Sequence, residues 1–305
     1  MQRIYKGVIR EVTRFGHFEG MTEDLTSCPL CDGNSSFLVF RSSGGVGFYK
    51  CRNCNLMYAS PRFTEESMLK IYENEKFADL SDFDNWSYDR WSQTGNRSYN
   101  IQQMKIMLIK RYLSAGNRIL DVGCGTGLFV LEANKNRFLC EGMEPSMRLS
   151  EIGSNVLKVP VSTAQIEDYN PAYKFNGIVI WDVLEHVYSP AGILKKCFEL
   201  LEAGGFLFLQ VPNHRGISNR YKTLLYRLKL KGTDYKHFGF PWHVYSYDRE
   251  SLSVLLNKTG LNPVLFESWS HLLKDGKNSF IARTLSSFTK KLCLSDYIVC
   301  AAQKI

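Results

Sequence analysis

The sequence predicts a doubly wound α/β domain with a mainly parallel sheet, preceded by a small metal-binding module. The chain of 305 residues is 44% hydrophobic, which is enough to form one large buried core. Strand-like and amphipathic helix-like segments alternate from residue 98 onward. Two CxxC pairs precede them, within residues 27–60. These three observations lead to the predicted architecture.

The composition indicates a soluble protein. No run approaches the roughly 18 to 20 consecutive apolar residues of a membrane-spanning helix, and the N-terminus has no apolar core followed by a small-residue cleavage site. We therefore expect a cytoplasmic protein. The formal charge of +8 favours anionic partners only weakly, because the basic residues are spread along the chain. Nucleic acid is not expected as a partner, whereas peripheral contact with a membrane stays open.

The first 97 residues are predicted to form three parts. Residues 1–26 are an arm to which no function is assigned. Residues 27–60 form a β-rich module, because FLVF and VGFYKC are short strand-like runs separated by the glycine turn RSSGG. Residues 61–97 hold a helix capped by Thr64, followed by a polar linker or a loop over a site.

The β-rich module carries a four-cysteine pattern. Cys28 and Cys31 form the first CxxC pair, Cys51 and Cys54 form the second, and 19 residues separate the pairs. Each short spacing lets a tight turn direct two sulfurs at one point, and four thiolates complete a tetrahedral zinc shell. Since such a shell has no open position, we expect structural Zn²⁺ in a zinc ribbon. Disulfides are disfavoured by the odd cysteine count and the isolated positions of the other five.

From residue 98 the expected helices and strands alternate in a regular order. The helix NIQQMKIMLIKRYL leads to the strand RILDVG, the helix GLFVLEANKN and the segment FLCEGMEPS, a strand with a turn. The strand FNGIVIWDVL, the helix AGILKKCFELL and the strand GFLFLQVPN follow, and DYIVCAAQK is the last strand. A further helix is capped near Tyr247 and Asp248. Such alternation places helices on both faces of a mainly parallel sheet.

The segment ILDVGCGTG predicts the cofactor. Its strand enters a loop with Gly123, Gly125 and Gly127 at alternate positions and then a helix, so the backbone can approach a ligand closely. A dinucleotide-binding loop usually places two residues between its last two glycines, whereas one residue separates them here. Asp121 closes the strand, and its carboxylate would repel a pyrophosphate but suits a cationic sulfonium. The loop therefore favours S-adenosylmethionine over NAD.

This loop resembles that of class I, Rossmann-like S-adenosylmethionine-dependent methyltransferases. The resemblance implies a seven-stranded sheet within residues 98–305. It also implies that Glu144 holds both ribose hydroxyls, as one carboxylate can, and that a segment such as Ala164 to Ile166 covers the adenine. The cofactor-binding candidates are Asp121, Gly123, Cys124, Gly125, Gly127, Glu144, Pro145, Gln165, Ile166, Trp181, Asp182 and Val183.

The segment WDVLEHV resembles the turn after the fourth strand of that family, which faces the transferred methyl group. Ligands of open α/β sheets bind at the carboxyl ends of strands, so His186 is a candidate base. The spacing of Asp182, Glu185 and His186 also resembles ubiquinone-pathway O-methyltransferases and small-RNA 2′-O-methyltransferases, which implies a divalent metal as an alternative. Trp181 departs from the acidic residue expected before Asp182.

The segment PWHVYSYDRESL resembles the P-x-H segment of zinc-ribbon methyltransferases of polysaccharide and deoxysugar pathways. In sugar C-methyltransferases a histidine there acts in base chemistry, so the resemblance makes His243 a catalytic candidate, with Tyr245 nearby. The longer Tyr-His-Glu-His run of those enzymes is missing, which argues against carbon methylation. A packing role for His243 is the alternative.

Together these patterns predict a methyltransferase of a small molecule. The zinc ribbon, the P-x-H segment and a basic amphipathic segment between Arg215 and Lys236 favour a sugar, a nucleotide sugar or a glycan terminus, methylated at oxygen or carbon. The basic segment is either a lid for an anionic or lipid-linked substrate or a solvated helix. The alternatives are a metal-assisted O-methyltransferase of a quinone-like or RNA substrate, an NAD-binding oxidoreductase, and a nucleic-acid-binding ribbon that uses Arg41, Lys50 and Arg52.

Overall fold

The computed structural model describes most of the chain. The described residues are 21–41, 45–68, 86–93, 95–228, 239–270, 290 and 292–305. The first 20 residues of the predicted arm, most of the helix after Thr64 and the end of the basic segment lie outside them. Among the described helices, none is long and apolar enough to cross a bilayer.

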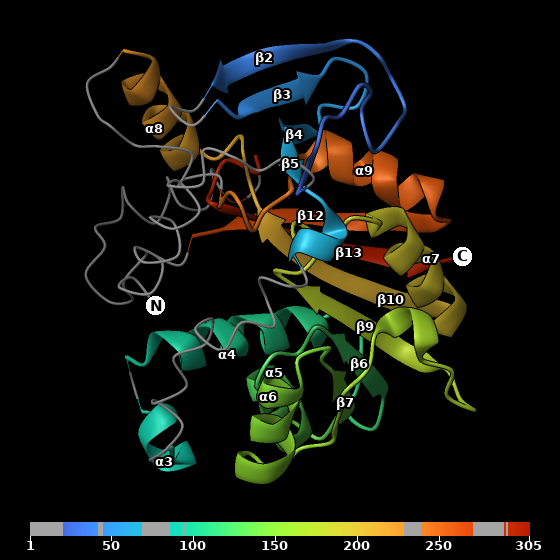
Figure 1. Ribbon diagram of the computed structural model, residues 1–305. Coiled ribbons are helices and arrows are strands. Elements are labelled where there is room, and N and C mark those ends of the chain that lie inside the picture. The colour runs from blue at the N-terminus through green and yellow to red at the C-terminus, as the bar shows by residue number, and fades with distance from the viewer. Residues whose placement is uncertain are drawn as a thin grey trace.

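The large sheet contains seven strands, which confirms the predicted fold class (Figure 1). In spatial order they are β12 (Leu261–Trp269), β13 (Tyr297–Lys304), β10 (Leu201–Pro212), β9 (Phe175–Trp181), β6 (Arg118–Val122), β7 (Leu139–Met143) and β8 (Val161–Ser162). The strands from β10 to β8 are parallel, whereas β13 is antiparallel to both neighbours. The strand order reverses between β6 and β9, so their carboxyl ends form the expected place for a ligand.

Helices cover both faces of this sheet, as Figure 1 shows. On one face lie α4 (Arg97–Ile109) and α5 (Leu128–Lys135), and on the other lie α7 (Pro190–Leu200) and α9 (Arg249–Lys258). Successive strand residues point to opposite faces, so Ile119 packs with α4 and α5 while Leu120 packs with α7 and α9. The fold therefore has two apolar layers around one sheet.

The remaining helices are short or peripheral. They are α3 (Tyr88–Trp91), α6 (Met147–Glu151) with the π-helical turn η3 (Ile152–Val156), the 3₁₀ turn η4 (Ile166–Asp168), and α8 (Ile217–Arg227). Helix α8 lies within the basic segment that was predicted between Arg215 and Lys236. Residues 65–68 are helical, and the Ser67 N–H donates to Thr64 Oγ1 over 3.3 Å, which confirms the predicted cap.

A second sheet joins the ribbon to the rest of the chain. Its order is β11 (Tyr245–Ser246), β4 (Met57–Ser60), β3 (Gly47–Cys51) and β2 (Ser36–Arg41), and all pairs are antiparallel. The predicted ribbon strands correspond to β2 and β3. Strand β11 comes from the far end of the chain and pairs with β4. A two-residue strand inside a loop carries no periodic pattern, so the sequence did not predict this connection.

Arg62 reinforces the connection between the ribbon and the α/β domain. It lies in β5 (Arg62–Phe63), which pairs with β1 (Thr22–Glu23). Its guanidinium group donates to Glu23 Oε1 over 2.7 Å and to the Tyr245 hydroxyl over 2.8 Å, and its Cζ lies 4.6 Å from the centroid of the Tyr188 ring. Since Arg62 is only 7% exposed, these contacts fix it between the two parts of the molecule.

Candidate functional site

The loop between β6 and α5 has three glycines at positive φ. Gly123, Gly125 and Gly127 have φ values of +70°, +55° and +79°. A Cβ on Gly123 would lie 2.6 Å from Val183, and one on Gly127 would lie 2.9 Å from Val159, so both glycines allow close packing. A Cβ on Gly125 would have no heavy atom within 4 Å among the described residues. Gly125 therefore borders open space in which a ligand fits against the backbone.

Glu144 lies at the end of β7, beside this loop. Its Oε2 accepts from the Gly125 N–H over 2.9 Å, and its Oε1 accepts from the Ser146 N–H over 3.0 Å. Burial raises the pKa of Glu144, and these two N–H donors oppose that shift. Each oxygen keeps further acceptor capacity, so the carboxylate is positioned and still able to bind two vicinal hydroxyls. The candidate Pro145 separates Glu144 from Ser146.

Asp121 places a second carboxyl group at the loop. It is 2% exposed, and burial raises its pKa to about 7 against the opposing charge of Lys105. The Lys105 Nζ lies 4.9 Å from the centroid of the Trp181 ring. Trp181 itself is buried between α4 and α5, where it packs edge-on against Phe129. A cationic ligand beside Asp121 would favour its ionised form, whereas Trp181 has little ring surface left for a ligand.

Two of the other cofactor candidates, Val183 and Cys124, lie at the same loop. Val183 packs on Gly123, and Cys124 packs against Gly142 of β7. Burial raises the pKa of the Cys124 thiol, so it is a packing group rather than a nucleophile. Gln165 is exposed before η4, whereas Ile166 is buried in the core beside α7. Of these two predicted adenine-covering residues, only Gln165 therefore offers an exposed side chain.

Asp182 follows β9 at the same edge of the sheet. It has a φ of +59°, and its two oxygens accept from Gln210 Nε2 of β10 over 2.9 and 2.7 Å. Burial raises the pKa of Asp182, and Lys105 and Gln210 oppose the shift. Gln210 thus orients the Asp182 carboxylate, and Asp182 is not among the residues whose ligand atoms converge near His186.

Glu185, His186 and His243 converge on one point. One ligand atom from each lies within 4.8 Å of the others, and the two imidazole rings meet edge to face with centroids 4.8 Å apart. His186 Nδ1 lies 3.0 Å from the Trp242 carbonyl. Since a carbonyl only accepts, we assign the proton of a neutral His186 to Nδ1. Nε2 then keeps a lone pair, as a metal ligand requires.

Glu185 makes this group a candidate cation site. It is 1% exposed, and neither carboxylate oxygen has a hydrogen-bond partner within the described part of the chain. Burial raises its pKa well above the ordinary value, and nearby Asp182 adds to the shift. A buried carboxylate without a partner is costly. Two imidazoles and a carboxylate are suitable ligands for a divalent transition ion.

The three metal ligands suggested by the sequence and the three that converge in the structure differ by one residue. The sequence suggested Asp182, Glu185 and His186, whereas the structure replaces Asp182 by His243. His243 was predicted as a base. Because it lies far from His186 along the chain, no local sequence pattern indicated that the two histidines would meet. The β11 region brings it there, because the backbone N–H of Val244 donates to the Glu185 carbonyl over 2.8 Å.

A family model described as a methyltransferase domain matches residues 99–265. The chain belongs to this methyltransferase family. It is therefore an S-adenosylmethionine-dependent enzyme, as the glycine loop predicts, and the NAD-binding alternative is set aside.

Two relatives and two solved structures illustrate the similarity. A ubiquinone biosynthesis O-methyltransferase of Coxiella burnetii (strain Dugway 5J108-111) is 26% identical over 218 residues, which cover 67% of this chain and 93% of the relative. One of Xanthomonas axonopodis pv. citri is 31% identical over 51% of this chain and 69% of the relative. A methyltransferase structure from Archaeoglobus fulgidus has 17% identity and a TM-score of 0.49, covering 71% of this chain and 98% of that one. The N-methyltransferase NodS of Bradyrhizobium japonicum, in complex with S-adenosylhomocysteine, has 14% identity and a TM-score of 0.46, covering 73% and 95%.

Tyr245 does not contribute to the methyltransferase site in the way the sequence suggested. It is 2% exposed, its hydroxyl accepts from Arg62, and it donates to the Tyr188 carbonyl over 3.1 Å. Burial raises its pKa, although Arg62 opposes this shift. The side chain thus holds β11 in place, which leaves base chemistry to other groups.

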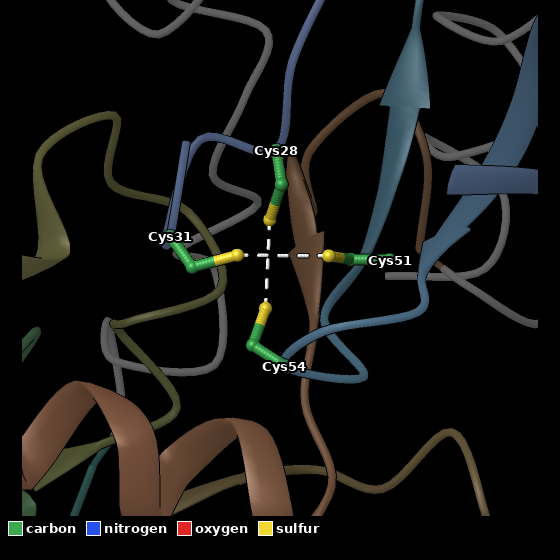
Figure 2. A group of neighbouring side chains, drawn as sticks. All are labelled: Cys28, Cys31, Cys51 and Cys54. Carbon is green, nitrogen blue, oxygen red and sulfur yellow. Dashed lines mark hydrogen bonds between the residues drawn. The ribbon is translucent and has the colours of Figure 1, made fainter. Parts of the chain in front are cut away.

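The four ribbon cysteines of the methyltransferase point at one centre, as Figure 2 shows. All four are free thiols. Sγ of Cys28 lies 3.5 Å from Sγ of Cys54, and Sγ of Cys31 lies 3.6 Å from Sγ of Cys51. Tetrahedral zinc with bonds of about 2.3 Å would separate its sulfurs by about 3.8 Å. The hydrogen bond between Cys28 and Cys54 lowers the pKa of Cys28 and raises that of Cys54, so these two thiols share one proton. The cluster therefore fits zinc.

Proposed function

We propose that this methyltransferase transfers a methyl group to a hydroxyl oxygen of a quinone-like small molecule, with a divalent ion held by Glu185, His186 and His243. The buried Glu185 carboxylate carries the proposal, because it faces two imidazoles and has no hydrogen-bond partner among the described residues. Without a cation this arrangement destabilises the fold.

The relatives support the same choice of acceptor. Those from Coxiella burnetii and Xanthomonas axonopodis are named for ubiquinone biosynthesis and for O-methylation. This similarity favours a quinone-like acceptor over the sugar, nucleotide sugar or glycan terminus expected from the sequence. The chain lacks the Tyr-His-Glu-His run of sugar C-methyltransferases, and this difference also favours methylation of oxygen over methylation of carbon.

Different side chains bind the cofactor and the acceptor. The glycine loop and Glu144 bind the nucleoside part of S-adenosylmethionine, and Asp121 favours its positive charge. A divalent ion, when bound, lowers the pKa of an acceptor hydroxyl and fixes its orientation. The hydroxyl oxygen forms a bond to the methyl carbon as the bond from that carbon to sulfur breaks in line, S-adenosylhomocysteine leaves, and the hydroxyl proton passes to solvent water. Gln210 holds Asp182 beside this path.

A structural zinc ion in the ribbon is part of the proposal. Its four thiolate ligands leave no open position for a substrate. The Asn53 N–H donates to Cys51 Sγ over 3.3 Å, and such donors stabilise a thiolate ligand. Zinc would therefore hold the ribbon that carries β4.

The test separates metal binding from catalysis. Zinc-loaded protein, dialysed free of other divalent ions, is titrated with Mn²⁺, and binding is followed by electron paramagnetic resonance. We expect one tight Mn²⁺ site in the native chain and its loss in Glu185→Gln. The exposed Glu151 offers a matched control, since Glu151→Gln removes the same charge elsewhere.

Activity is then measured with S-adenosylmethionine and a catechol. We expect methylation of a catechol oxygen, seen by mass spectrometry, that depends on Mg²⁺ or Mn²⁺ and is lost in Glu185→Gln. Full activity of Glu185→Gln, or no Mn²⁺ site in the native chain, would refute the metal site. Methylation of a sugar nucleotide but not of any catechol or phenol would refute the acceptor class.

A further inference from the structure

A cavity outside the methyltransferase site lies where the ribbon, the end of β10 and α8 meet. Its volume is about 490 Å³, and Lys50, Asn55, His214, Arg215, Arg220 and Glu250 line it. Lys50 belongs to β3 of the ribbon, whereas Arg220 belongs to α8. The cavity therefore exists only when the ribbon is docked on the rest of the chain.

Basic groups outnumber acidic groups at this cavity. Glu250 Oε1 lies 3.3 Å from Arg215 Nη1. Asp248 lies behind the wall, 1% exposed, with Oδ2 at 3.8 Å from Lys50 Nζ and 4.0 Å from Arg215 Nη1. Two carboxylates thus face three permanent cations, because Arg220 has no acidic group within ion-pair distance among the described residues. The excess of positive charge favours an anion.

His214 forms part of the wall with a largely buried side chain. Its side chain is 6% exposed, and Nε2 lies 3.4 Å from Asp248 Oδ2. Neither of these two buried atoms makes a hydrogen bond within the described part of the chain. The imidazole therefore lies against the buried Asp248 carboxylate, which leaves Lys50 and Arg220 as the groups for an anion.

An apolar cavity of about 520 Å³ adjoins the basic one and shares Lys50, His214 and Arg220 with it. Its other lining residues are Val39 and Met57 of the ribbon and Ile217, Tyr221, Thr223 and Leu224 of α8. Tyr221 and Leu224 are 61% and 52% exposed, which is high for large apolar side chains. The two cavities together match a ligand with an anionic end and an apolar end.

We propose that these joined cavities bind a phosphomonoester with an apolar substituent. The guanidinium group of Arg220 and the ammonium group of Lys50 suit a phosphate, which accepts charge-assisted hydrogen bonds. The substituent lies between the ribbon and α8, against Met57 and Leu224. This site is separate from the Glu185 cluster, so it does not depend on the proposed metal-assisted reaction.

The test uses the full zinc-loaded chain and isothermal titration at constant ionic strength with butyl phosphate and inorganic phosphate. We expect butyl phosphate to bind about tenfold more tightly, because part of its chain leaves water. Arg220→Gln should weaken both ligands about tenfold. Leu224→Ser should weaken butyl phosphate alone.

The control is Lys222→Gln, which removes a charge from an exposed position of α8 outside both cavities. It should leave both affinities unchanged. Equal weakening by Lys222→Gln and Arg220→Gln would show non-specific attraction and overturn the site. Equal affinity for the two ligands would overturn the apolar half, and no binding of either would overturn the whole proposal.

Discussion

Glu185 Oε1 lies 4.0 Å from Nε2 of the next residue, His186, which is too far for a hydrogen bond. Glu185 is 1% exposed, whereas the His186 side chain is 31% exposed, so solvent reaches the imidazole but not the carboxyl group. The neutral form of Glu185 is therefore favoured, in keeping with its raised pKa, and a bound cation would shift the group to its ionised form. This relationship has a consequence for stability as well as for catalysis.

Glu185→Gln should stabilise the zinc-loaded protein in the absence of other divalent ions, while it abolishes metal-dependent methyl transfer. Replacing a buried carboxyl group that has no hydrogen-bond partner among the described residues should raise the free energy of unfolding by about 1 to 3 kcal/mol. Urea unfolding followed by circular dichroism measures this change. Glu151→Gln should leave the free energy of unfolding unchanged, and a loss of stability in Glu185→Gln would mean that the carboxylate has a partner.

Cys51→Ser should remove zinc from the purified protein and destabilise the ribbon. Losing one of four thiolates breaks the closed shell, and the metal contributes directly to folding of such a small module. Metal analysis should find one zinc ion per native chain and a marked loss in the variant. Cys293→Ala, which lies outside the cluster, should keep its zinc; unchanged zinc content in Cys51→Ser would contradict the assignment.

Gly125→Ala should weaken binding of S-adenosylhomocysteine by about tenfold or more. The alanine methyl would occupy the open space beside the loop, where the cofactor is expected, and its φ of +55° would be strained. Gly116→Ala is the matched control, because Gly116 also has positive φ and open space but lies in the turn before β6. Isothermal titration should show an affinity loss only in Gly125→Ala, with similar losses of thermal stability in both.

Asp248 should make stability depend on acid pH. Burial alone would raise its pKa, but the proximity of His214, the Ser251 N–H and Lys50 lower it below the ordinary value. A lowered folded-state pKa stabilises the protein above the unfolded pKa of about 4, and this contribution disappears as pH falls through the folded pKa.

Asp248→Asn tests this dependence, because asparagine can still cap α9. Native protein should lose about 1 kcal/mol more stability than Asp248→Asn between about pH 5 and pH 3. Urea unfolding at a series of pH values measures the difference. Parallel stability profiles for the two proteins would refute the role of the carboxylate charge.

The sequence predicted the parts of the fold that carry a strong periodic or capping signal. The apolar strands from Ile119 and from Phe175 have that signal, as does the helix that Asp248 caps. Strand β12, which includes Pro263, was not predicted, because its exposed and buried residues do not alternate cleanly. Helix α4 ends at Ile109 rather than at Leu113, because N–H groups of the next turn donate to the Leu108 and Ile109 carbonyls.

In the candidate site, too, only features with a local sequence pattern could be predicted. Local motifs indicated the glycine loop, Glu144 and the cysteine pairs, since each lies within a short stretch of chain. The partnership of His243 with Glu185 depends on the hydrogen bonds that β11 and its neighbours make, which no local pattern encodes. The contacts of Tyr245 could not be predicted for the same reason, because its hydroxyl partner Arg62 lies far away in the sequence.

The pairing of Tyr245 with Tyr58 also bears on biosynthesis. The ribosome completes β4 long before it reaches β11, so the nascent ribbon presents an unpaired strand edge while the catalytic half is still being made. Such edges invite pairing with other chains. A fragment that stops before β11 would keep that edge permanently, and its tendency to self-associate would be a property of the truncation rather than of the enzyme.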